Sequence, residues 1–386
     1  MRSRVPPASL ACALVVLAAL ASPSPVVAAE GPRPKAEPAV LVRDQERLWL
    51  RADGAWKDVT ALVGLETDGR SFPSTFDRLD GWRFLWTYDD TSFRIADPLA
   101  GTSRAVALPP GKGFRHGLAL AEDGALWWSL QQRTTAPLTR TFEGRHALLV
   151  SGPGRGQYQV RPAGAGGQIV YTSNPGLGGN ESSYYVDLVF GSPETLHWLA
   201  APGTAPRSLA RHDCIRAPHF VDENRVAFWR NGAVDEQAGT KTWILSLVGT
   251  APPKAKDPGK AEDVATLSFP KLQERSEPFL LASGDGLLAW PGDWTGDLDR
   301  PASTVAVLDT ATGARRTAGV PGGPRILLPP RRHHVGHHVV FYDDAGQRLV
   351  ALDLRSPSAE PVAVPSDYSK GPRPSWAVVL EPPATP

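Results

Sequence analysis

The chain has 386 residues, with 41 Lys and Arg against 40 Asp and Glu, and this near neutrality gives no long-range attraction for nucleic acid or an anionic membrane surface. Its 37 Gly and 38 Pro are spread along the whole length, which excludes an architecture of long helices. It has only two cysteines, so disulfides cannot replace a hydrophobic core.

The N-terminal 29 residues have the pattern of a secretory signal peptide. Two arginines precede the apolar run Leu10–Ala21, and the small residues Ala28 and Ala29 fit a cleavage before Glu30. The run is too short to span a bilayer, although an uncleaved anchor is the alternative. We therefore expect a periplasmic or secreted protein with a Sec-type signal and no membrane insertion after cleavage. Its remaining cysteine, Cys214, is expected to be a buried structural thiol rather than a nucleophile.

Beyond a Pro-rich leader at residues 30–38, apolar residues come in short runs bounded by Gly, Pro, Asp and Asn, which is typical of strands and turns. The runs recur in a fixed order: an aromatic-ended strand, a polar hairpin, a second strand, a turn, and a short strand that often follows an arginine. Clear copies are Phe84–Pro109, Leu287–Pro321 and Val339–Pro365, and looser ones are Arg47–Leu62, Gly117–Leu130, Ile169–Phe190 and Val226–Pro253.

An all-strand unit that repeats in this way predicts a β-propeller, because no unit can bury its apolar faces without neighbours on both sides. We expect an all-β chain with a single propeller over residues 39–381 and a Pro-rich tail at 382–386. The propeller should have seven blades, with six as the alternative, of mostly four antiparallel strands. Ser375–Leu380 is expected to pair with Ala39–Val42 and close the ring.

One segment carries a family resemblance. In "PHFVDENRVAFW", Pro218, Phe220, Asn224 and Phe228 resemble the repeat of TolB-like β-propellers, in which a Pro-x-Trp/Phe-Ser-Pro-Asp-Gly turn leads into a strand ending in Phe. Val-Asp stands here where that family has Ser-Pro. The resemblance extends over nearly the whole expected propeller and implies the fold. It leaves the activity open, because such propellers serve as binding scaffolds, peptidase appendages and enzymes.

The segment "RRHHVGHHVVFYDD" holds four of the nine histidines. We place it in the turn between the first and second strands of the last full blade, with Gly336 where the backbone requires a positive φ. His334 and His337 would then face each other across the hairpin, close enough to share a divalent metal. Two ligands make a weak site, so we expect no cofactor and a polar turn, with the metal pair as the alternative.

A ligand is expected elsewhere, at the hairpins between second and third strands, which share one face of a propeller. They are long in three consecutive units: Thr172–Ser183, Arg230–Lys241 and Pro291–Ser303. Aromatic rings for stacking and polar groups for hydrogen bonds suit an extended polar ligand, and ordinary variation in loop length is the alternative. The candidate ligand-binding residues are Trp229, Arg230, Asn231, Trp290, Asp293, Trp294, Asp297, Asp299, Asn180 and Glu181.

The sequence has no Gly-x-Ser-x-Gly elbow, phosphate-binding loop, His-Glu-x-x-His or Cys-x-x-Cys motif. It therefore favours an exported, non-catalytic, monomeric scaffold that binds an envelope protein or a glycan, and no nucleic acid. The alternative is an extracytoplasmic, metal-assisted polysaccharide lyase or hydrolase whose site is assembled from distant loops.

Overall fold

The computed structural model forms two compact units, Met1–Ala36 and Glu37–Pro386, and every residue that it describes belongs to the second. The expected signal peptide and the 382–386 tail therefore lie outside the described residues. Among the described residues, no helix is long and apolar enough to cross a membrane. The described residues are 38–44, 47–63, 75–80, 82–87, 92–109, 111, 113–131, 137–150, 158–163, 166–173, 193–235, 237–251, 261–270, 280–284, 286–293, 302–320, 322, 324–327, 336–356, 359–362 and 374–381.

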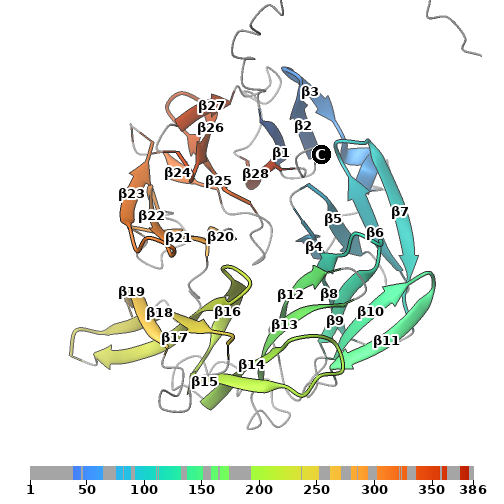
Figure 1. Cartoon of the computed structure of the whole chain (residues 1–386). Coiled ribbons are helices and arrows are strands. Elements are labelled where there is room, and N and C mark those ends of the chain that lie inside the picture. Colours follow the sequence, from blue (N-terminus) through green and yellow to red (C-terminus); the bar gives the residue numbers. More distant parts are fainter. Residues whose placement is uncertain are drawn as a thin grey trace, which may run out of the picture. The chain divides into compact units, whose positions relative to one another are not determined.

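Seven antiparallel sheets of four strands each lie in a ring, so the chain is a seven-bladed β-propeller, as the sequence predicts (Figure 1). We number six blades in chain order and name the seventh the closing blade. Blade 1 is β4 (Thr75–Arg78), β5 (Phe84–Thr87), β6 (Ser92–Asp97) and β7 (Thr102–Ala107); blade 2 is β8 (Phe114–Leu120), β9 (Leu126–Gln131), β10 (Leu138–Phe142) and β11 (Arg145–Val150); blade 3 is β12 (Tyr158–Ala163), β13 (Gly166–Ser173), β14 (Pro193–Leu199) and β15 (Arg207–Asp213).

The remaining blades follow the same order from the first to the fourth strand. Blade 4 is β16 (Arg216–Phe220), β17 (Arg225–Asp235), β18 (Thr240–Gly249) and β19 (Glu262–Pro270); blade 5 is β20 (Ala282–Gly284), β21 (Leu287–Pro291), β22 (Thr304–Asp309) and β23 (Arg315–Gly319); blade 6 is β24 (Arg325–Ile326), β25 (His338–Asp343), β26 (Arg348–Asp353) and β27 (Ala359–Val362); the closing blade is β28 (Trp376–Leu380), β1 (Ala39–Asp44), β2 (Arg47–Ala52) and β3 (Ala55–Asp58), with a short 3-10 turn at Thr60–Val63.

The ring is closed by the two ends of the propeller sequence. β28 pairs antiparallel with β1, with Ala39 opposite Leu380 and Arg43 opposite Trp376, so the last strand of the chain becomes the first strand of the closing blade. This confirms the predicted pairing of Ser375–Leu380 with Ala39–Val42.

The core lies between blades. Clusters of buried apolar side chains fill each junction around the ring, for example between the closing blade and blade 1, where the rings of Phe84 and Trp376 stack with centroids 6.4 Å apart. The second strand of a blade is covered on both faces in this arrangement. Its aromatic residues are therefore core residues, and Trp86, Trp127 and Trp229 are completely buried.

Candidate functional site

The histidine-rich segment lies between β24 and β25, the first and second strands of blade 6, as predicted. Gly336 has φ +135°, which confirms the predicted positive φ at this position. His337 follows it, and His338 is the first residue of β25. His334 lies outside the described residues, so the proposed pairing of His334 with His337 stays a prediction.

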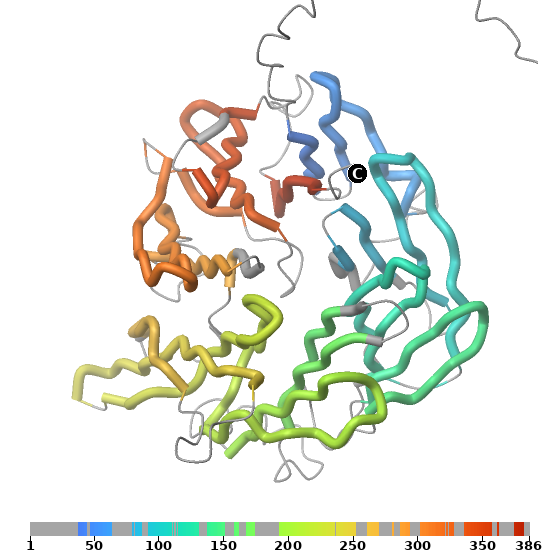
Figure 2. Tube along the Cα trace, viewed as in Figure 1, coloured from blue at the N-terminus to red at the C-terminus, as the bar shows by residue number. Residues whose placement is uncertain are grey.

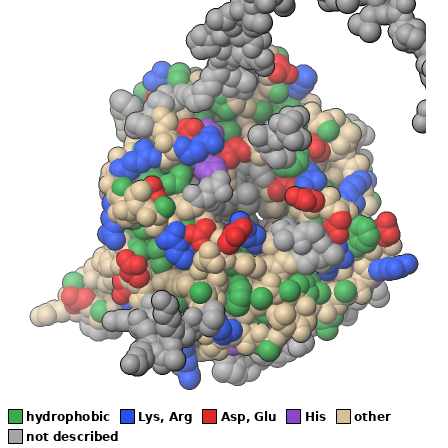
Figure 3. All heavy atoms as spheres, viewed as in Figure 1, with side chains coloured by type: hydrophobic (Ala, Val, Ile, Leu, Met, Phe, Trp, Pro, Cys, Tyr) green, Lys and Arg blue, Asp and Glu red, His purple; other side chains and the backbone are tan. Residues whose placement is uncertain are grey.

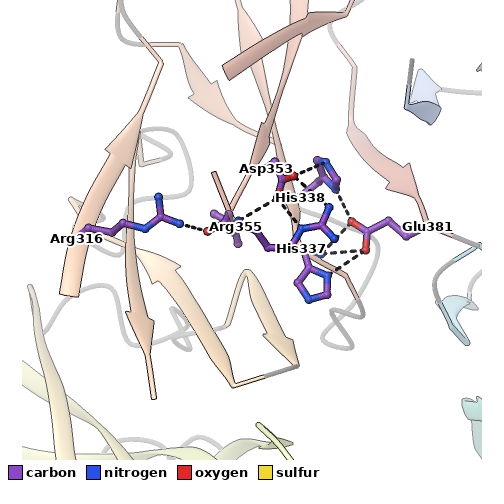
Figure 4. A network of polar contacts seen from close by, with 7 residues as sticks. Arg316, His337, His338, Asp353, Arg355 and Glu381 are labelled. Atoms are coloured by element: carbon purple, nitrogen blue, oxygen red, sulfur yellow. Dashed lines mark hydrogen bonds and ion pairs between the residues drawn. The ribbon is translucent and has the colours of Figure 1, made fainter. Parts of the chain in front are cut away.

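Glu381 lies against this turn, although it is 43 residues further along the chain than His338. It directly follows β28, and Figure 4 shows its carboxylate turned toward both histidines. The backbone N–H of His337 donates to both carboxylate oxygens, at 2.9 and 3.1 Å. The Nδ1 atom of His338 lies 2.5 Å from Oε1, and that of His337 lies 3.5 Å from Oε2. Glu381 therefore joins the closing blade to blade 6.

A second carboxylate lies on the other side of His338. The Nε2 atom of His338 is 3.9 Å from Oδ2 of Asp353, which stands opposite His338 in the β25–β26 register. Arg355 donates to both oxygens of Asp353, at 3.0 and 3.1 Å. Burial alone would raise the pKa of Asp353, but the hydrogen bonds from Arg355 lower it. Both acids are thus bound by side chains of the protein itself.

On the face shown in Figure 3, histidine side chains lie among acidic and basic ones. This mixture suits a charged contact between blades. No group of three or more His, Cys, Asp or Glu among the described residues is arranged to hold a metal ion. Sequence reasoning missed Glu381 because it searched near the histidines, and nothing in the local sequence marks a carboxylate that arrives with the closing strand.

The face predicted to bind a ligand has the expected topology. The connections between second and third strands are residues 174–192 in blade 3 and 292–303 in blade 5, against 88–91, 132–137, 344–347 and 45–46 in blades 1, 2, 6 and the closing blade. Blade 4 differs from the prediction, because the segment Arg230–Lys241 is a ribbon rather than a loop. β17 and β18 stay paired as far as Asp235 and Thr240 and run side by side to the end of the ribbon (Figure 2).

Two predicted stacking residues on this face need correction. Trp229 is completely buried and Trp290 is 7% exposed, and both belong to the core cluster that joins blades 4, 5 and 6. Each lies on the second strand of its blade, where both faces are covered. Neither ring can stack on an external ligand in this structure. Five other candidates lie outside the described residues: Trp294, Asp297, Asp299, Asn180 and Glu181.

The remaining candidates are engaged within the protein. Arg230 donates to Ser246 at 3.1 Å and to Asp263 at 2.7 Å. Asp293 accepts hydrogen bonds from the backbone N–H groups of Ser303 and Thr304 at 2.9 Å, so its carboxylate ties together the two ends of the blade 5 hairpin. Burial works against ionisation of Asp293, but these bonds and that from the Ser303 hydroxyl lower its pKa.

Asn231, the last of the predicted residues, lies on β17 within the ribbon. Its Oδ1 atom is buried, and among the described residues it accepts no hydrogen bond. The five predicted residues that the structure describes therefore lie in blades 4 and 5, as parts of the core and of the strand network rather than as an open cluster.

Sequence reasoning missed a pair of side chains on blade 3. Ser173 is the last residue of β13, and its Oγ atom lies 2.7 Å from Nε2 of His197 on β14. The imidazole of His197 stacks on the ring of Tyr171, with centroids 4.8 Å apart and planes at 22°. Tyr171 in turn stacks on Tyr158 at 5.6 Å. Burial lowers the pKa of His197 and raises those of both tyrosines.

No motif marks this pair, because its members are 24 positions apart in the sequence and a whole hairpin connection lies between them. Only the register shows it: Tyr171 stands opposite His197, and Ser173 opposite Thr195, which makes Ser173 and His197 diagonal neighbours on one face of the sheet.

Comparison with known families finds no matching family model, and comparison with curated proteins finds no matching sequence. Solved structures resemble the chain at low identity. The β-propeller domain of the Trilobed protease from Pyrococcus furiosus is 8% identical, with a TM-score of 0.46 over 76% of this chain and 85% of that one. Oligogalacturonate lyase from Vibrio parahaemolyticus is 11% identical, with a TM-score of 0.46 over 86% and 92%.

A third similar structure is a catalytically inactive virginiamycin B lyase from Staphylococcus aureus with quinupristin, 13% identical, with a TM-score of 0.39 over 76% of this chain and 85% of that one. Similar structures thus include a protease domain and lyases, and none of these likenesses decides between binding and catalysis. A functional proposal for this β-propeller therefore rests on its own residues.

Proposed function

We propose that the protein is an exported β-propeller scaffold that binds a protein partner through the face that carries the second-to-third-strand connections of blades 3, 4 and 5. The observation that carries this proposal is that the long connections of blades 3 and 5 flank the extended ribbon of blade 4, whereas the corresponding connections of the other four blades have two to six residues. A tight hairpin would satisfy the backbone at each of these places, so three neighbouring extensions on one face favour a shared surface.

The chemistry of the described residues favours a protein over a glycan. A glycan site needs exposed aromatic rings on which sugars stack, and the rings of Trp229 and Trp290 are buried. The ribbon of blade 4 instead exposes two aliphatic side chains near its end, Ala233 and Val234, and Val234 keeps 40% of its surface accessible. An apolar side chain on a projecting ribbon suits contact with another polypeptide.

The test is affinity capture of a partner from an envelope extract of the source organism, with the wild-type chain and two matched variants. Val234→Asp places a charge on the ribbon, whereas Leu148→Asp places the same charge on the outer strand of blade 2, where Leu148 is 63% exposed. We expect a protein that the wild type and Leu148→Asp retain at equal levels and that Val234→Asp loses by at least about tenfold.

Equal retention by both variants would exclude the ribbon as the binding surface. Retention of deproteinised polysaccharide, with no protein bound, would show that the face binds a glycan instead.

A further inference from the structure

Ser173 and His197 have the geometry of a serine that is activated by a neighbouring base. The hydroxyl and the Nε2 atom are 2.7 Å apart, within the range of a hydrogen bond that can pass a proton. With the proton of the neutral imidazole on Nδ1, Nε2 accepts from the serine hydroxyl. Ser173 ends a strand beside a long connection and keeps 8% of its surface exposed.

The surroundings hold the imidazole in this position. The ring of Tyr171 lies parallel to it at 4.8 Å and fixes its plane, and Tyr158 supports Tyr171 from the adjacent strand β12. The same burial favours the neutral form of His197. A base that is neutral and already oriented is ready to take up the serine proton without rearrangement.

We propose that Ser173 is a nucleophile, with His197 as its general base, for acyl transfer from carboxylic esters. Esters rather than amides are the expected class, because no carboxylate among the described residues contacts His197 to stabilise the imidazolium that forms during attack. A weak base–nucleophile pair of this kind needs a good leaving group. The proposal does not depend on the binding function proposed above.

The chemistry balances without a cofactor. Oγ of Ser173 attacks the ester carbonyl carbon and forms a C–O bond, while its proton moves to Nε2 of His197. The bond to the ester alkoxide breaks, and the imidazolium returns the proton to the departing alcohol. Water, deprotonated by His197, then cleaves the acyl–serine bond, which releases the carboxylic acid and restores the serine.

The test uses a fluorophosphonate, which reacts with activated serines: the serine oxygen displaces fluoride from phosphorus and leaves a stable phosphonate ester. The full wild-type chain is incubated with the probe, and the modified residue is mapped by mass spectrometry. We expect the adduct on Ser173. The labelling rate should rise with pH through a single ionisation with a midpoint below 6.5, the ordinary histidine value, because burial lowers the pKa of His197.

Two variants and a control complete the design. Ser173→Ala should lose the adduct, and His197→Gln should label at least about 100-fold more slowly and without the pH dependence. Ser208 is the matched control, since it is an exposed serine that stands opposite His197 on β15. Ser208→Ala should label at the wild-type rate.

Absence of an adduct on Ser173 in the folded wild type would overturn the proposal whatever the variants do. It would also be overturned by an adduct on Ser173 that forms equally fast in His197→Gln, because the imidazole would then only pack against the serine.

Discussion

Gly336 shows how a single residue without a side chain makes the contact with Glu381 possible. A Cβ atom at this position would lie 2.9 Å from Oε2 of Glu381, closer than such contacts occur, and the φ of +135° is one that other residues rarely adopt. The missing side chain lets the carboxylate reach the backbone N–H of His337. The glycine before His337 and His338 therefore makes room for a carboxylate from the same chain.

Because of Glu381, the free energy of unfolding of the protein should depend on pH. Burial alone would raise its pKa, but hydrogen bonds from His338 and His337 and their charge lower it from 4.5 to about 2. A carboxyl group whose pKa is lower in the folded than in the unfolded state stabilises the fold above pH 4.5, and this contribution disappears as the pH falls to 2. Glu381→Gln should therefore unfold at lower urea concentration than wild type at pH 5, by on the order of 3 kcal/mol, and match it near pH 2.

Glu262→Gln is the control for this comparison, because Glu262 is an exposed residue at the start of β19. Its unfolding curves should follow those of the wild type at each pH. A constant difference between Glu381→Gln and wild type from pH 5 to pH 2 would mean that the carboxylate is not held by the histidines.

At the scale of single residues, the sequence predicted features that depend on neighbouring residues in the chain. It did not predict contacts between residues that are distant in the sequence. The positive φ of Gly336 follows from turn chemistry within a few residues. The contact of Glu381 depends on ring closure, and the Ser173–His197 pair depends on strand register. Trp290 was assigned to a binding surface because it ends a strand beside a polar hairpin. The strand in fact lies between two neighbouring blades, and the ring packs into their core.

At the scale of strands, the recurrent arginine of the sequence repeat joins one blade to the next. Among the described residues, an arginine on the fourth strand donates to a main-chain carbonyl in the following blade at three places. Arg104 of blade 1 reaches Gly124 in blade 2, Arg207 of blade 3 reaches Thr250 in blade 4, and Arg316 of blade 5 reaches Leu354 in blade 6. The arginines can be recognised in the sequence repeat. Their partners lie 20 to 43 residues further along the chain, and only the structure identifies them.

If these contacts join the blades, two arginines on the same strand, Arg207 and Arg211, should contribute unequally to the free energy of unfolding. Arg207 also lies over the ring of Trp198, at 5.1 Å from its centroid, whereas Arg211 is exposed further along β15. Arg207→Gln should lower the free energy of unfolding by about 1–2 kcal/mol, because a half-buried carbonyl loses a charged donor. Arg211→Gln should change it by less than about 0.5 kcal/mol. Urea unfolding curves of the two variants measure the difference, and equal effects would refute a role for the blade-to-blade contact.

The ribbon of blade 4 shows why a strand was predicted to be a loop. Asn231, Gly232 and Ala233 read as turn residues, but they form an irregularity within β17, where the pairing shifts between Asn231 and Val234. Gly232 is tightly packed there, since a Cβ atom would lie 3.1 Å from the side chain of Ile244. The sequence does not distinguish a glycine at a bulge from a glycine in a loop. Here the pairing of β17 with β18 identifies a bulge.

For the whole molecule, the fold was predictable because the sequence pattern that produces a blade is repeated along the chain. Each unit shows the same order of apolar runs and turns, and every junction between blades buries apolar side chains from both partners. No blade is stable by itself under this arrangement, so the ring as a whole should fold as one unit. The ring closes where β28 joins β1, through five residues.

Removal of β28 should therefore open the ring and destabilise the whole propeller. All five residues of β28 are buried, and they pack both against blade 6 and against blade 1. Loss of this burial costs on the order of 10 kcal/mol, which is comparable to the total stability of an ordinary domain. A chain that ends at Ser375 should show no cooperative thermal transition by circular dichroism and should elute as aggregates from a sizing column. A chain that ends at Glu381 keeps β28 and the carboxylate, and it should melt within about 2 °C of the full chain. A cooperative transition of the shorter chain at the same temperature would show that the other six blades hold the ring closed without the last strand.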